Sequence, residues 1–181
     1  MVVRALAVLL ALTGLFLSTN GARAELYWSR DFDSAALGAK MKYSIYLPSG
    51  YHAPKQQKQR HPTVYLLHGV GDNERAWPSW GGVEATLDQM IASKALSPMI
   101  VVMLASKRSW YVDSADIGGP GNYATAVRDD LRAHIKKRYC ARTDRGGRAI
   151  AGLSMGGFGA MRLAFERPEI YRAVGAMSSA L

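Results

Sequence analysis

The stretch from Arg148 to Ala164 reads R-A-I-A-G-L-S-M-G-G-F-G-A-M-R-L-A and decides the fold. Its first six residues, Arg148 to Leu153, are mostly apolar and predict a buried β-strand. The pattern from Gly156 to Glu166 predicts a helix, which Pro168 stops. Between the two lies Gly-Leu-Ser154-Met-Gly, a G-x-S-x-G sequence typical of a sharp strand-to-helix turn with an exposed serine hydroxyl.

Glycine on both sides of this serine has a physical reason. At Gly152 and Gly156 a Cβ atom would crowd the neighbouring backbone of so tight a turn, while Ser154 is held in a strained backbone conformation. The alternative is a glycine-rich turn with an incidental serine. Because the pattern follows a predicted strand and opens a predicted helix, we interpret Ser154 as a catalytic nucleophile.

Strand-like and helix-like segments alternate along the rest of the chain. Residues Lys42–Leu47 alternate polar and apolar side chains, as a half-buried strand does. Apolar runs predict further strands at Thr63–Leu67, Met99–Leu104 and Tyr171–Met177, and helical spacing predicts helices at Val83–Leu96 and Ala124–Tyr139. From Thr63 onward the order βαβαβαβ predicts an α/β fold, with a mostly parallel sheet, right-handed crossovers and helices on both faces.

A second element supports the hydrolase interpretation. The strand Thr63–Leu67 leads into His68-Gly69-Val70-Gly71, and ligands of open α/β sheets bind at the carboxyl ends of such strands. Attack on a carbonyl needs two backbone N–H donors for the oxyanion, one after the nucleophile and one from an upstream loop. Met155 and Val70 occupy those positions. For His68 we predict a side chain that fixes the turn by bonding to backbone, in preference to a catalytic role.

The candidates for the substrate pocket are aromatic residues in loops near the expected mouth of the site: Trp77, Trp80, Trp110 and Tyr111. The last two belong to the long loop Ser106–Tyr123, and long loops in compact domains are often binding loops or lids. Such rings could line a pocket for an aromatic acyl group. Core filling and loop packing explain them equally well, so the alternatives stay open.

Composition places the chain among ordinary globular proteins. It has 181 residues, of which 49% are hydrophobic and 20% charged, and its single Cys excludes an intrachain disulfide. The formal net charge of +9 does not identify a partner. The basic loop His52–Arg60 contains no aromatic residue between its cations for stacking, so nucleic acid is not expected as a partner.

The N-terminus predicts export. A short positive start precedes the apolar run Ala5–Leu17, which is too short to span a bilayer, and Ala22-Arg23-Ala24 has the small-x-small pattern of a cleavage site. We expect a signal peptide over residues 1–24, a folded domain over residues 25–181, and a secreted or periplasmic location. Stable membrane insertion after cleavage is not expected.

Three motifs carry a resemblance to a known family. Y-L-P-S-G-Y at residues 46–51, Y-L-L-H-G-V-G-D-N-E-R-A-W at residues 65–77 and the stretch Arg148–Ala164 resemble the esterase family that includes feruloyl esterases, S-formylglutathione hydrolase and the mycolyltransferase antigens. The resemblance implies an α/β-hydrolase fold, Ser154 as nucleophile, an oxyanion hole at Val70 and Met155, and neither metal nor cofactor. The implied substrate is a small ester or an acylated carbohydrate.

The histidines depart from the family's pattern. In α/β-hydrolases the acid and the histidine of the triad follow the serine, whereas all four histidines here precede Ser154 and only Glu166 and Glu169 follow it as acids. We therefore expect the N-terminal part of an esterase, without its C-terminal strands and helices, inefficient and poorly soluble by itself. Two interpretations remain: a secreted serine carboxylesterase or related acyltransferase, and a non-catalytic remnant that binds a carbohydrate or a partner.

Overall fold

The computed structural model describes residues 23–54 and 59–180. The expected signal peptide therefore lies outside the described residues, apart from Arg23 and Ala24. The strands are β1 (Glu25–Ser34), β2 (Ala39–Leu47), β3 (Thr63–Leu67), β4 (Ile100–Leu104), β5 (Arg148–Leu153) and β6 (Ala173–Met177). The α-helices are α1 (Ala76–Ser79), α2 (Val83–Ala92), α3 (Tyr123–Thr125), α4 (Arg132–Arg138) and α5 (Met155–Glu166), and a π-helical segment, Ala126–Leu131, joins α3 to α4.

The strands form one mostly parallel sheet in the order β1-β2-β4-β3-β5-β6. Strands β4, β3, β5 and β6 run parallel, as predicted. The half-buried strand predicted at residues 42–47, which precedes the parallel series, is β2, and it pairs antiparallel with both β1 and β4. Strand β1 was not predicted, since a register shift between Tyr27 and Arg30 interrupts its alternation of buried and exposed side chains.

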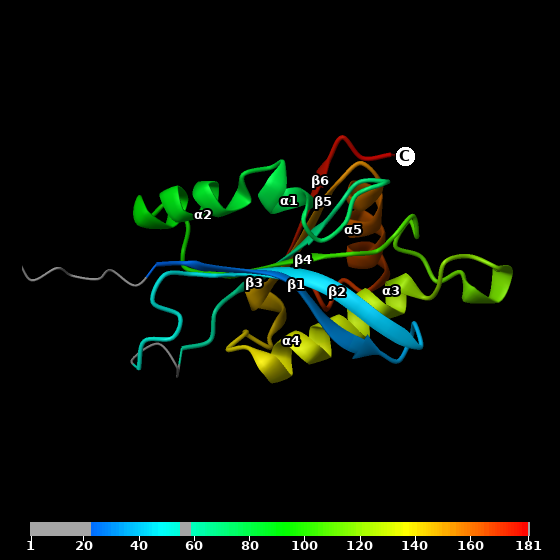
Figure 1. Cartoon of the computed structure of the whole chain (residues 1–181), viewed down its shortest axis with the longest axis horizontal. Coiled ribbons are helices and arrows are strands. Elements are labelled where there is room, and N and C mark those ends of the chain that lie inside the picture. Colours follow the sequence, from blue (N-terminus) through cyan, green and yellow to red (C-terminus); the bar gives the residue numbers. More distant parts are fainter. Residues whose placement is uncertain (1–22, 55–58, 181) are drawn as a thin grey trace, which may run out of the picture.

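Different helices cover the two faces of the sheet, which confirms the predicted layers (Figure 1). On one face Leu87 of α2 packs with Tyr46, Val101 and Met103. On the other, side chains of α4 and α5 join those of the strands in the larger core, among them Ile135, Leu163, Tyr65, Leu104 and Ile150. The helix α2 ends four residues before the predicted Leu96, because the backbone turns at Lys94, whose φ is +61°.

Two neighbouring strands bring the candidate residues together. In the parallel pair β3 and β5, Leu67 lies opposite Gly152, so the His68 loop and the turn at Ser154 leave the sheet side by side at one edge. Beyond β5 lies β6, an edge strand of this sheet with Val174 40% and Met177 41% exposed. No helix among the described residues is long and apolar enough to cross a membrane.

Candidate active site

Ser154 sits at the junction of β5 and α5 in a conformation that L-residues rarely adopt. Its φ is +56° and its ψ is −117°, outside both the helical and the extended regions. Neighbouring backbone holds it there: the Ser154 N–H donates to the Met177 carbonyl at 2.9 Å, and its carbonyl accepts from the N–H groups of Phe158 at 3.1 Å and Ala180 at 3.3 Å. The residue remains partly exposed, as a nucleophile must be to meet a substrate.

Steric contact with the neighbouring backbone requires glycine at both positions that flank the serine. A Cβ atom at Gly152 would lie 2.2 Å from the Gly156 carbonyl oxygen, and one at Gly156 would lie 2.3 Å from the Leu67 carbonyl oxygen. Neither approach is possible between real atoms, and backbone cannot move aside as a flexible side chain can. These distances agree with the expectation that a side chain at either position would crowd the neighbouring backbone.

The loop after β3 lies directly beside Ser154. A Cβ atom built on Gly69 would be 3.7 Å from the Ser154 Cβ and 3.6 Å from the Leu153 carbonyl oxygen, which is ordinary van der Waals contact. The residues Gly69 to Asp72 form a turn closed by a hydrogen bond from the Asp72 N–H to the Gly69 carbonyl at 3.3 Å. Gly71 takes a φ of +87°, as the third residue of such a turn requires.

His68 holds the peptide between Gly69 and Val70 in one orientation. Its Nε2 accepts from the Ser106 N–H at 3.0 Å, so the ring proton is on Nδ1, which lies 2.7 Å from the Gly69 carbonyl and donates to it. A trans peptide points its N–H opposite to its carbonyl, so the Val70 N–H faces away from the His68 ring. These bonds are the ones expected of a side chain that fixes the turn through backbone.

Burial sets the charge of His68. The side chain is only 1% exposed, and desolvation lowers its pKa below the ordinary histidine value, although its bond to Gly69 opposes the shift. His68 is therefore neutral near pH 7, with both ring nitrogens bonded to backbone. It orients the turn and does not present a free nitrogen to a serine hydroxyl.

Met155 provides the second candidate N–H donor. It is the first residue of α5, and the N–H groups of the first helical turn have no partner within the helix. Its side chain is fully buried, which fixes the backbone that carries this N–H. Val70 is by contrast 52% exposed, so only the backbone bonds of its turn hold it in position.

Tyr111 lies in the core, which corrects its assignment to a pocket wall. The residue is 0% exposed, and its hydroxyl donates to the His68 carbonyl at 3.0 Å. Its ring fills the space left open by Gly159, where a Cβ atom would come within 2.4 Å of it. Sequence alone could not reveal this, because Gly159 and Tyr111 meet only after α5 packs against the loop. In the sequence, the glycine at position 159, on the buried face of α5, is the one sign that a large side chain packs against this helix.

Trp77 and Trp110 take different places around the site. A hollow of about 420 Å³ opens beside Ser154, and its wall comprises His68, Gly69, Asp72, Ala76, Trp77, Trp80, Gly81 and Leu153. Trp77 and Trp80 therefore both line this hollow, and Trp80 is 86% exposed. Trp110 packs edge-on against Phe158 of α5, with ring centroids 5.8 Å apart.

The other histidines have partners elsewhere. His52 lies 3.5 Å from Glu25, His134 contacts the Tyr43 hydroxyl at 2.9 Å, and His61 precedes β3 at the opposite end of the strand from His68. Within residues 23–54 and 59–180, no group of three or more His, Cys, Asp or Glu side chains is placed to hold a metal ion.

This arrangement defines the class of protein as an α/β-hydrolase: a mostly parallel sheet with helices on both faces and a serine at a strained strand-to-helix turn. The sequence agrees, since residues 34–181 match the model of the family described as "Putative esterase". The chain belongs to this esterase family.

Two of the three relatives described below are esterases by name, and the third is a hydrolase. The chain is 33% identical over 153 residues to an endo-1,4-beta-xylanase/feruloyl esterase of Xylanibacter ruminicola, a match that covers 81% of this chain and 20% of that protein. A solved ferulic acid esterase has 29% identity and a TM-score of 0.79, and the match covers 88% of this chain and 59% of that one. An S-formylglutathione hydrolase of Staphylococcus aureus, at 19% identity and a TM-score of 0.71, shares the fold over 86% of this chain and 58% of its own. The chain thus spans less than two thirds of these relatives.

Proposed function

We propose that Ser154 is the nucleophile of a serine carboxylic ester hydrolase that works through an acyl-enzyme. The strained backbone of Ser154 carries this proposal, because such strain persists only where the surroundings hold it and is concentrated at functional sites. The hydroxyl oxygen attacks the ester carbonyl, and the alcohol leaves with a proton. Water or a second alcohol then takes the acyl group from the serine.

The negative oxygen of the tetrahedral intermediate would be held by the N–H groups of Val70 and Met155. Removing one such donor from a serine hydrolase costs about 100- to 1,000-fold in turnover. The bonds from His68 and Asp72 to the Gly69 carbonyl favour this assignment, since they fix the Val70 N–H before substrate arrives. His68 and Gly69 act here as support for the loop, and metal or cofactor has no role in the proposed steps.

The hollow beside Ser154 is proposed to take the acyl part of a small ester or of an acylated carbohydrate. Its volume of about 420 Å³ is within the range of small-molecule sites, and Trp77 and Trp80 give its wall aromatic side chains suited to an aromatic acyl group. The names of the feruloyl esterase relatives support this substrate class. We also propose that the protein is exported, because residues 1–24 contain an apolar run followed by a cleavage pattern.

A second candidate, a non-catalytic binding protein, is favoured by one observation. The proton of Ser154 needs a base, and the two ring nitrogens of His68 are both bonded to backbone. A chain without a base beside Ser154 would bind an ester in the hollow without turning it over efficiently.

Acetylation by p-nitrophenyl acetate separates the two candidates. This activated ester reacts with an aligned serine even when turnover is poor, so we expect slow, stoichiometric acetylation that peptide mapping assigns to Ser154. The variant Ser154→Ala should lose it, whereas Ser179→Ala, which removes a nearby serine hydroxyl, should keep it. Acetylation spread over lysines, or unchanged in Ser154→Ala, would exclude Ser154 as the nucleophile and leave the binding protein.

A further inference from the structure

A second cavity, of about 170 Å³, lies between α4 and the beginnings of β3 and β5. Its wall comprises Tyr65, Arg132, Ala133, Lys136, Ala141, Arg142, Thr143 and Arg148. Arg148 begins β5 and Ser154 follows its end, so at about 3.3 Å per residue the two are about 20 Å apart. This cavity is therefore separate from the candidate active site.

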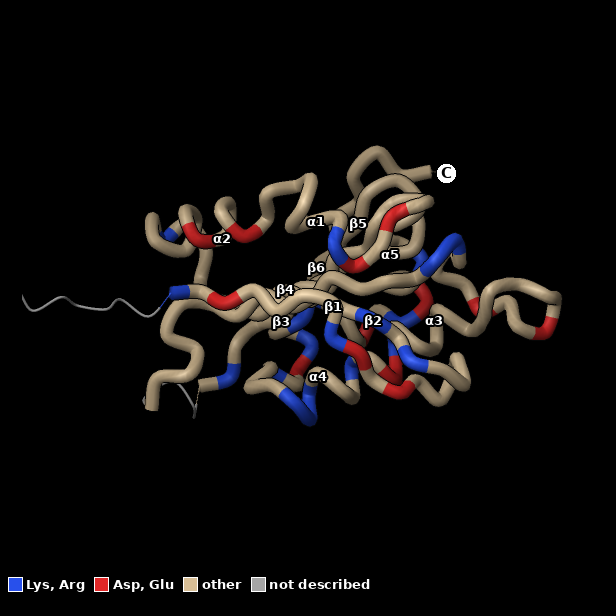
Figure 2. Tube along the Cα trace, viewed as in Figure 1, with Lys and Arg blue, Asp and Glu red and all other residues tan. Residues whose placement is uncertain are grey.

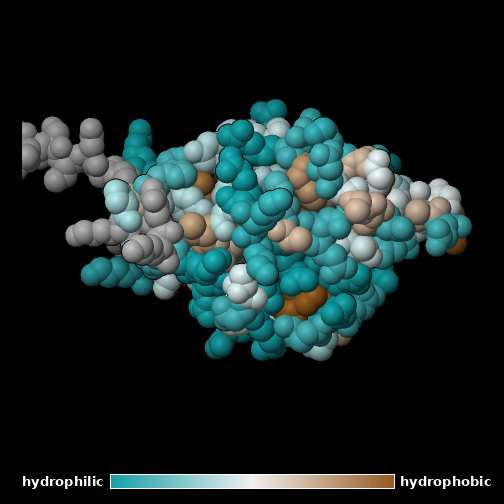
Figure 3. Space-filling model, turned by 90° about the horizontal axis from the view of Figure 1, so that it is seen from below, coloured by the Kyte–Doolittle hydropathy of each residue, from teal (hydrophilic) through white to brown (hydrophobic). Residues whose placement is uncertain are grey.

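The wall carries four cations and no carboxylate. Lys and Arg also gather on the surface around α4 (Figure 2), and the face of the molecule seen from below is mostly hydrophilic (Figure 3). Apolar ligands are therefore poor candidates for this cavity, whose lining is cationic.

Arg148 is buried and forms no ion pair with a described carboxylate, although the charge of Asp144, which is paired with Arg142, lies close enough to interact with it. It is 8% exposed, and its Nε donates to the Ile170 carbonyl at 2.9 Å and its Nη1 to the Thr143 carbonyl at 2.6 Å. Carbonyl groups fix the guanidinium in place but leave its charge, and no carboxylate of the described residues forms an ion pair with it. Buried cations are ordinarily paired, so this one favours an anion in the adjacent cavity.

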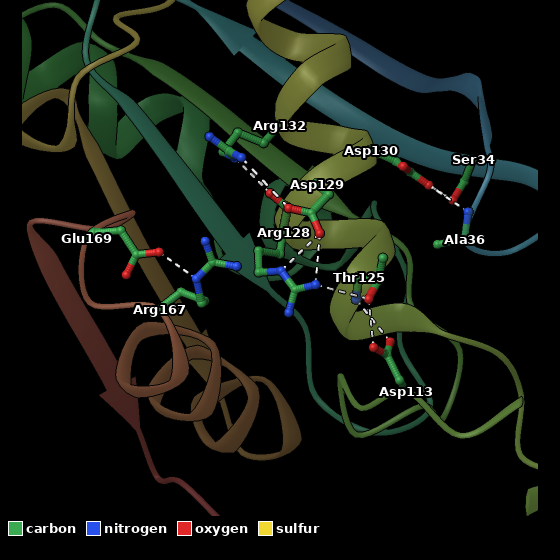
Figure 4. A network of polar contacts seen from close by, with 10 residues as sticks. All are labelled: Ser34, Ala36, Asp113, Thr125, Arg128, Asp129, Asp130, Arg132, Arg167 and Glu169. Atoms are coloured by element: carbon green, nitrogen blue, oxygen red, sulfur yellow. Dashed lines mark hydrogen bonds and ion pairs between the residues drawn. The ribbon is translucent and has the colours of Figure 1, made fainter. Parts of the chain in front are cut away.

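Arg132 is held in a similar way from the helix side. Its Nε donates to the Arg128 carbonyl at 2.7 Å, while Nη2 is 3.8 Å from Asp129 Oδ1. The other oxygen of Asp129 accepts from Arg128 at 2.8 Å, so this carboxylate is shared between two arginines (Figure 4). Lys136 lies one helical turn beyond Arg132 and also lines the cavity.

The remaining charges nearby do not cancel the excess. Arg142 is paired with Asp144 at 2.6 Å, and Glu169 is paired with Arg167. Tyr65 adds a phenol to the wall; burial raises its pKa, and the positive charges of Arg148 and Arg132 oppose that shift, as expected for cations close to its hydroxyl. A neutral phenol can donate a hydrogen bond to an anion.

We propose that this cavity binds a small tetrahedral oxyanion, a phosphate group that is either free or a monoester. Guanidinium groups fixed by backbone carbonyls suit phosphate oxygens, which accept paired N–H bonds from arginine. At roughly 30 Å³ per water molecule the space holds about five or six waters, which is enough for a phosphate group. Because the ligand would contact α4, β3 and β5 at once, it would stabilise the folded state.

Thermal unfolding of the purified chain in inorganic phosphate, at an ionic strength matched with chloride, tests the proposal. We expect a saturable rise in Tm that chloride does not reproduce, and phenyl phosphate in place of phosphate distinguishes a monoester from the free ion. The variants Arg132→Gln and Lys136→Gln should weaken binding by about tenfold each. Lys137→Gln is the matched control, since Lys137 is next in the helix but lines a different hollow.

Lys136 is exposed, so Lys136→Gln should fold even if a variant of Arg132 does not, and its affinity can be measured by calorimetry. The proposal is overturned if phosphate gives no saturable rise in Tm beyond chloride. It is also overturned if Lys136→Gln and Lys137→Gln bind phosphate with the same affinity.

Discussion

The turn at Ser154 depends on single residues, and Gly156 is one that no larger residue can replace without strain. A Cβ atom there would lie 2.3 Å from the Leu67 carbonyl oxygen, so Gly156→Ala should destabilise the fold by about 1–3 kcal/mol or more through overpacking. Gly69→Ala is the matched comparison, because its nearest contact would be 3.6 Å, and we expect less than about 1 kcal/mol. Urea unfolding of both variants measures the difference; equal losses would show that the turn can relax.

His68 connects the stability of the site to pH. Burial lowers its pKa in the folded state, so just below the ordinary histidine pKa of about 6.5 the unfolded chain binds more protons than the folded one. The free energy of unfolding should therefore have its full value above about pH 6.5 and decrease as the pH is lowered from there. Protonation would place a hydrogen on Nε2, which now accepts the hydrogen bond from the Ser106 N–H, and the two donors would then face each other.

Urea unfolding on either side of about pH 6.5 checks this expectation. His68→Asn should show a smaller loss on acidification than the parent chain. His134 also has a pKa lowered by burial, so His134→Gln is needed as a control. In a chain that already carries His134→Gln, His68→Asn should still reduce the loss of stability on acidification. An identical pH dependence in the parent and His68→Asn would contradict the account.

At the scale of elements, the loop after β4 and the helix α5 form one packed unit. Lys107, Trp110 and Tyr111 all have positive φ values, between 51° and 55°, and the loop places the Tyr111 ring against Gly159. Gly159→Ala should destabilise the chain by about 1–3 kcal/mol. In a Tyr111→Leu background the same substitution should cost clearly less, because the ring that it meets is gone. Additive losses in a double-mutant cycle would mean that the two residues do not meet.

The elements that sequence could predict are those with a local cause. Strands β3 and β5 are mostly apolar runs, and the turn at Ser154 follows from glycines that leave no room for a side chain. Strand β1 could not be predicted because its register shift interrupts the alternation. Tyr111 could not be placed either, since its burial depends on a glycine far along the chain. Its sequence position in a long loop fits a pocket wall equally well.

At the scale of the whole molecule, we expect the geometry of the site to keep turnover inefficient. With the ring nitrogens of His68 bonded to backbone, kcat/KM for p-nitrophenyl acetate should fall below about 10⁴ M⁻¹s⁻¹, the lower end of the ordinary range. Residual turnover from an oxyanion site alone is expected, since serine hydrolases without a working triad retain roughly 10³- to 10⁴-fold over water. Steady-state kinetics of the parent chain and of His68→Ala test this expectation. Efficient turnover by the parent that His68→Ala abolishes would show that His68 is the base.

The position of the oxyanion tests the central claim most directly. A structure of the chain after reaction with an aryl fluorophosphonate would carry a phosphonyl group whose oxygen stands for that of the tetrahedral intermediate. The account predicts the phosphorus on Ser154 Oγ and that oxygen roughly 2.7–3.1 Å from the backbone nitrogens of both Val70 and Met155. A phosphonyl oxygen turned to solvent, or the group on another residue, would contradict it.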